Sequence, residues 1–144
     1  MVESGSYGDR PSQHSEFTMN YQEEKQIIET YFESFWTHTP VMFENKQYDG
    51  DSEWIRLSIQ NGDAFQATMG DDPAFRHPGV VFVQIFTKTD TGSGRALELA
   101  DFVDALFRNL VLPEGIYFKM PQVRKVQNSE WCQVNVSTEF YRGS

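Results

Sequence analysis

Apolar side chains recur with helical periodicity between residues 20 and 36. Asn20, with Glu23 three positions later, has the form of a capping box at a helix N-terminus. One face of the helical wheel collects large apolar side chains, namely Tyr21, Ile28, Tyr31, Phe32, Phe35 and Trp36. Pro40 disfavours helical backbone at the residue before it. We therefore predict an amphipathic helix that lies on a sheet and ends near Trp36 or Thr37.

A two-residue alternation follows in residues 53–60, where Ile55, Leu57 and Ile59 share one side of an expected strand. Residues 41–43 form a shorter extended piece. Residues 80–87 are almost continuously apolar, which is typical of a central strand covered on both faces.

A second helical period covers residues 95–110, after a loop at residues 89–94 that offers capping side chains. Its expected buried stripe is Ala96, Leu99, Ala100, Val103, Leu106, Phe107 and Leu110. Asp104 and Arg108 have the spacing of a helical ion pair. Leu97 and Phe102 fall on the flanks of the stripe and are candidates for contact with a neighbouring subunit.

Three further strands are predicted at residues 116–120, 122–127 and 131–141, with a turn at Asn128 and Ser129. The order of elements predicts an α+β fold, in which two amphipathic helices pack on a mixed, mostly antiparallel β-sheet. We expect residues 19–144 to form one domain.

Residues 1–18 are rich in Gly, Ser and charge and lack an apolar period. Such a segment cannot offset its ordering entropy alone. It is either an arm that becomes ordered on a partner, with Tyr7 and Phe17 as contacts, or a leader that precedes a second start at Met19.

The connection between Asp63 and His77 is long and carries Phe65, Gln66, Phe75 and Arg76. Long ordered connections in compact domains are usually functional. Aromatic and Arg side chains are enriched at interfaces. We therefore expect this segment at a surface that contacts another subunit or a tube protein, with Phe65 and Arg76 as anchors.

Composition narrows the classes of partner. Twenty-one acidic against twelve basic residues give a net charge of −9, which disfavours tight nucleic-acid binding. One cysteine, Cys132, permits no intrachain disulfide. Neither a membrane-spanning apolar run nor a signal-peptide pattern is evident, so we expect a protein that folds in a cytosol.

Catalytic and metal-binding patterns are weak. His14, His38 and His77 lie in separate segments without metal-ligand spacing. Gly92 and Gly94 precede a helix, but Leu97 stands where a dinucleotide fingerprint needs Gly or Ala. The acidic face of the second helix is typical of a solvated surface. We therefore predict no catalytic, cofactor or metal site.

Lys119, Arg124 and Lys125 form the one local basic cluster of the sequence. They either meet an acidic partner or DNA phosphates, or they protect a solvated strand edge.

Seven segments, in order and spacing, resemble the tail terminator-like proteins of long-tailed bacteriophages. They are residues 19–24, 54–67, 76–81, 96–101, 105–108, 131–136 and 140–142. The similarity spans residues 19–142 and leaves residues 1–18 outside it.

The resemblance implies an α+β domain that forms a six-membered ring without enzymatic activity or cofactor. The ring would cap the tail tube, stop its polymerisation and join the head-completion (stopper) protein, while DNA passes its lumen without specific binding. The protein would reside in the virion neck and assemble in the host cytoplasm, away from membranes. Alternatives are another neck or tail-completion protein, a small hydrolase or nuclease, or a simple binding domain.

Overall fold

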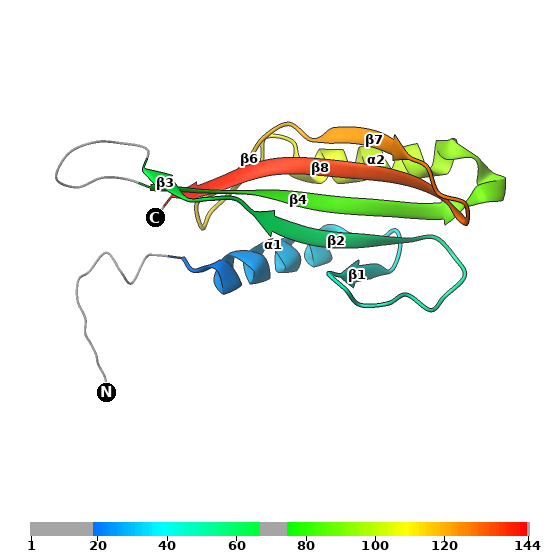
Figure 1. The fold of residues 1–144 in the computed structure, drawn as a ribbon, viewed down its shortest axis with the longest axis horizontal. Helices are drawn as coiled ribbons and strands as arrows, with labels where there is room; N and C mark the ends of the chain where they lie inside the picture. The colour runs from blue at the N-terminus through cyan, green and yellow to red at the C-terminus, as the bar shows by residue number, and fades with distance from the viewer. Residues whose placement is uncertain (1–18, 67–74, 144) are drawn as a thin grey trace.

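The computed structural model describes residues 19–66 and 75–143, so the expected contacts of Tyr7 and Phe17 lie outside the described residues. Within these ranges the chain has two α-helices, α1 (Tyr21–Phe35) and α2 (Ser93–Phe107), and a short 3-10 turn, η2 (Thr89–Thr91). They accompany one mixed, mostly antiparallel sheet (Figure 1). The predicted α+β fold is confirmed.

The sheet has the order β1-β2-β4-β8-β6-β5. Its strands in this order are β1 (Val41–Phe43), β2 (Trp54–Asn61), β4 (Phe75–Lys88), β8 (Trp131–Gly143), β6 (Ile116–Phe118) and β5 (Val111–Leu112). The short β3 (Phe65–Gln66) pairs with the start of β4, and β7 (Gln122–Val126) pairs with β8 beside β6. β1 runs parallel to β2, and the other pairings are antiparallel.

Both helices cover the same face of this sheet, because alternate residues of β2, β4 and β8 supply one continuous core with them. Leu57 pairs with Val83, and Val83 pairs with Val136, so this row crosses the three central strands. The rings of Phe32 from α1 and Phe107 from α2 stack above the sheet at 5.8 Å with 9° between their planes. This stacked pair joins the two helices into one layer.

Helix α1 has the predicted ends, and its capping box between Asn20 and Glu23 is formed. The predicted apolar face was wrong in part, because Tyr21 and Phe35 are 46% and 60% exposed. The line that faces the core is instead Glu24, Ile28, Phe32 and Trp36. Glu24 takes the position expected for an apolar side chain because it has a buried cationic partner, described below.

Helix α2 buries most of its predicted stripe, but it begins and ends earlier than residues 95–110. Its N-cap is Gly92, with φ of 70°, and no side chain caps the helix, so the expected capping residues were wrong. Asn109, with φ of 51°, ends the helical path and lets the chain turn into β5, which the sequence pattern did not predict.

Strand β4 is central but longer than predicted, and helices cover only one of its faces in the described part of the chain. The expectation of cover on both faces was therefore wrong. Its apolar side chains on the open face pack against other rings: Phe86 stacks on Trp54 at 4.3 Å, and Trp54 stacks on Tyr48 at 4.8 Å. Arg56 lies over the Trp54 ring at 5.0 Å. Side chains of the sheet and its loops thus bury Phe86 without a second layer.

Candidate protein-binding site

The chain brings its predicted anchor residues together at one end of the sheet, where β3 pairs with the start of β4 (Figure 1). Phe65 is directly opposite Arg76, and Gln66 is directly opposite Phe75. Residues 67–74, between these two short strands, lie outside the described residues. The predicted long connection is therefore, in its described part, an extension of the β-sheet.

We call the exposed face of this end the tip surface and define it by Phe65, Arg76, Pro78, Tyr117 and Tyr141. The guanidinium of Arg76 lies 5.2 Å from the centre of the Tyr141 ring, a cation–π contact. Tyr141 in turn stacks on Tyr117 at 5.1 Å with 16° between the planes. Phe65 is 54% exposed. The tip surface therefore offers a row of rigid aromatic and cationic groups to a partner.

A groove of about 530 Å³ runs along the tip surface. It is lined by Gly62, Phe65, Gln66, Arg76, Pro78, Gly79, Val80, Lys119, Glu139, Phe140 and Tyr141. Lys119 and Glu139 form an exposed ion pair of 3.5 Å at its side. An apolar floor with a few charged groups at the margin is the composition of a protein-binding groove.

The remaining predicted interface residues lie elsewhere. Asp63 is exposed between β2 and β3, whereas the strand alternation turns His77 to the helix-covered face. Leu97 packs half-buried against the core, and Phe102 stacks on His38 at 4.1 Å with 5° between the rings. Leu97 and Phe102 therefore sit on α2, and neither belongs to the tip surface.

Behind the tip surface lies a buried ion pair that fixes α1 to the sheet. The side chains of Glu24 and Arg142 are 1% and 2% exposed, and Nε of Arg142 donates to Oε2 of Glu24 at 2.5 Å. Nδ2 of Asn61 donates to the other carboxylate oxygen at 2.7 Å. Both oxygens of the buried carboxylate are thus hydrogen-bonded, which offsets part of the cost of removing its charge from water.

Two rings close this cluster. Tyr21 lies over the Arg142 guanidinium at 4.9 Å and meets His77 edge-on at 5.9 Å. Burial lowers the pKa of His77 below its ordinary value, and the neighbouring charge of Arg142 lowers it further. Protonation of His77 is therefore less favourable in the folded protein than in the unfolded chain.

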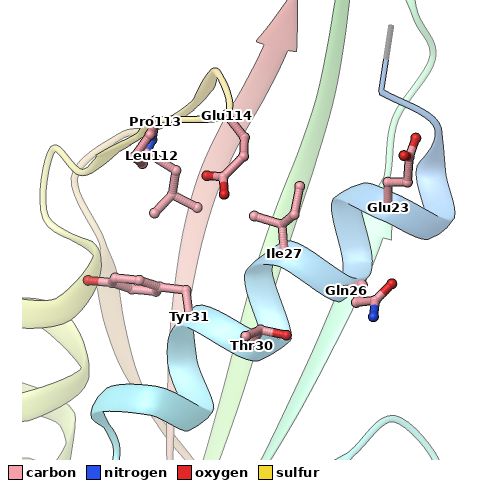
Figure 2. A pocket seen from close by; sticks show the side chains of 8 residues that line it. All are labelled: Glu23, Gln26, Ile27, Thr30, Tyr31, Leu112, Pro113 and Glu114. Atoms are coloured by element: carbon pink, nitrogen blue, oxygen red, sulfur yellow. The ribbon is translucent and has the colours of Figure 1, made fainter. Parts of the chain in front are cut away.

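A second groove, of about 480 Å³, separates α1 from the turn between β5 and β6. Figure 2 shows Ile27 and Tyr31 on α1 facing Leu112 and Glu114 across it. The hydroxyl of Tyr31 donates to the carbonyl oxygen of Leu106 at 2.7 Å. The described residues that line this groove are a mixture of apolar side chains, such as Ile27 and Leu112, and polar ones, such as Glu23 and Glu114.

Chemical groups that would bind a metal do not converge in the described ranges. Within residues 19–66 and 75–143, no group of three or more His, Cys, Asp or Glu side chains could hold a metal ion. Over the same residues, no helix has both the length and the apolar character needed to cross a membrane.

Sequence reasoning missed Tyr117, Tyr141, Glu24, Asn61 and Arg142 as members of these two clusters. Glu24, Ile28 and Phe32 follow one another at intervals of four residues, and this spacing was the available signal, since it places a carboxylate in the buried line. No comparable local signal pairs Glu24 with Arg142, because 118 residues separate them.

The chain matches the phage tail terminator protein family over residues 24–140. A solved structure is similar to this chain in fold, with a TM-score of 0.60 and 19% sequence identity. The similarity covers 83% of this chain and 95% of that chain. No curated protein matches the chain. The family match covers most of the folded domain, so this chain belongs to the phage tail terminator protein family and is a structural component of a phage tail.

Proposed function

We propose that this protein forms a six-membered ring on the finished tail tube, where it ends tube polymerisation and provides the joint to the head-completion protein. The tip surface carries this proposal. Arg76, Tyr141, Tyr117 and Phe65 form a preorganised aromatic and cationic row, and such residues dominate binding energy at protein interfaces.

The tip surface is the part of the ring that meets an axial partner, in this proposal the major tail tube protein. Rings that are already stacked lose little conformational freedom on binding, so the contact gains affinity at low entropic cost. The acidic balance of the chain suits a lumen through which DNA passes without specific binding, since like charges repel phosphates.

The chain then divides into one domain, residues 19–144, and an N-terminal arm, residues 1–18. In the assembled ring the arm runs extended over an adjacent subunit or a neighbouring virion protein, with Tyr7 and Phe17 as contacts. Deleting residues 1–18 should leave the thermal unfolding midpoint unchanged and raise the concentration needed for assembly. A deleted form that assembles at the same concentration as the full chain would exclude this role.

The ring itself is tested by the native mass of the purified protein in light scattering, followed by electron micrographs of the assembled species. The proposal predicts a mass of about six chains and closed rings at high concentration or on tube ends. A protein that stays monomeric at every concentration, both alone and with tube protein, contradicts it.

A further inference from the structure

The two long edges of the sheet carry opposite charge. Residues 115–129, which include β6 and β7, contain three basic residues and no acidic residue, on a chain with a net charge of −9. Residues 44–53, which connect β1 to β2, contain four acidic residues and one basic residue. Figure 1 shows β7 along one edge and β1 with this connection along the other. The charges thus lie on opposite sides of one subunit.

The β7 edge exposes apolar side chains as well as basic ones. All five residues of β7 are exposed, and Val123 and Val126, which precede and follow Arg124 and Lys125, are 42% and 37% exposed. Met120, just before the strand, is 57% exposed. Charged side chains protect an edge strand from pairing, whereas exposed apolar side chains on it invite contact. Apolar groups flanked by Arg124 and Lys125 instead have the make-up of an interface.

The opposite edge has exposed acidic side chains that can pair with these basic ones. Glu44 and Glu53 already form ion pairs within the subunit, with Lys25 at 3.4 Å and with Arg95 at 2.7 Å. Asp49 and Asp51 are exposed at the turn of the connection. β1, with three half-buried apolar residues, has strand β2 on one side in the described structure and forms the outer edge of the sheet.

A closed ring of identical chains uses a heterologous interface, in which two different surfaces of each subunit meet. We propose that the occupant of the β7 edge is a second copy of this chain, whose β1 edge and acidic connection face Arg124 and Lys125. The proposal rests on the ring proposed above and names the surfaces that close it. Strand ends, including the tip surface, then remain available for partners along the ring axis.

Charge reversal tests the arrangement by light scattering of the purified full-length protein. Arg124→Glu with Lys125→Glu places acid against acid and should raise the concentration at half-assembly about tenfold or more. Asp49→Lys with Asp51→Lys should weaken assembly to a similar degree. Combining all four substitutions in one chain, or mixing the two double variants, should restore assembly. A control, Arg108→Glu, reverses one exposed basic side chain at the end of α2, outside both proposed surfaces, and should assemble as wild type does.

Added salt gives an independent readout, because exposed charges are screened at high ionic strength. Wild-type assembly should weaken as salt rises from about 0.05 to 0.5 M, and assembly of the double variants should strengthen over the same range, because salt screens their like-charge repulsion. If the variant Arg124→Glu with Lys125→Glu assembles as wild type does, the inferred interface is wrong, whereas the proposal of a ring stands. If each double variant fails to assemble and the fourfold variant does not recover assembly, the inferred interface is also wrong. A wild-type protein that never assembles contradicts the ring itself.

Discussion

Arg142, near the end of the last strand, donates from Nε to Oε2 of Glu24 at 2.5 Å, in the first turn of α1. The two residues are 118 positions apart and both are almost fully buried. Because Arg142 is directly opposite His77 and two residues from Phe140, this contact ties the first helix to the strands that carry the tip surface. The ion pair therefore sets where the tip surface lies relative to the helical layer.

Breaking the Glu24–Arg142 ion pair should destabilise the fold. Glu24→Ala should lower the free energy of unfolding by about 3–5 kcal/mol, because it leaves the Arg142 charge buried without its partner. Glu24→Leu combined with Arg142→Met should be much less damaging, since two apolar side chains replace both charges. Urea unfolding of Glu24→Leu, of Arg142→Met and of the double variant measures the coupling between the two side chains. Strictly additive losses would show that the two side chains do not act as a pair.

The stacked rings between the helices give a second test. Phe32→Ala or Phe107→Ala should each cost about 3–5 kcal/mol, because both rings are fully buried and each would leave a ring-sized cavity. Phe35→Ala is the matched control in the same helix, since this ring is 60% exposed, and it should change stability by about 1 kcal/mol or less. Unfolding midpoints that do not separate the buried rings from Phe35 would contradict the packing.

His77 predicts how stability depends on pH. Its pKa is lowered in the folded state, so the unfolded chain binds the proton more readily. At high pH the titration of His77 does not change the free energy of unfolding. As pH falls below about 6.5, the ordinary pKa of His, preferential protonation of the unfolded chain lowers that free energy. His77→Gln should therefore reduce the fall in the melting temperature between about pH 7.5 and pH 5.5. If the melting temperature falls equally in wild type and in His77→Gln, His77 does not contribute to the pH dependence of stability.

Substitutions in the tip surface should abolish function while the protein remains folded. Phe65→Ala with Arg76→Glu should leave the melting temperature within a few degrees of wild type, because Phe65 is exposed, and should abolish control of tail length. Phe35→Ala with Arg108→Glu is the matched control, since it changes an exposed ring and an exposed Arg away from the tip. If the tip variant gives tails of normal length and infectious particles, the tip surface has no role in the control of tail length.

The local signals in the sequence predicted most elements, and the failures have physical causes. Both helices and the strands of the central sheet follow from periodicity, and the capping box identified the start of α1. Pro78 lies outside the predicted strand of residues 80–87, yet it is part of β4. Its carbonyl accepts from the Gly62 amide at 3.0 Å, on the side where the pairing passes from β2 to β3, so its missing N–H falls at a break in the ladder.

The candidate site was predictable only in part, because its residues meet through strand pairing. Phe65 and Arg76 could be proposed from one segment, and the pairing places them opposite one another. Tyr117 and Tyr141 join them through register between β6 and β8, which no local pattern reveals. The side of α1 that faces the core was mispredicted at Tyr21 because a buried Glu24 was not anticipated.

The most direct test is the length of tubes that purified tail tube protein forms when this protein is added during polymerisation. The account predicts that growth stops, that mean tube length falls as the added amount rises, and that electron micrographs show a ring at one end of each tube. The Phe65→Ala and Arg76→Glu variant should leave growth unchanged. Tubes that reach the same length with and without an excess of folded wild-type protein would contradict the central claim.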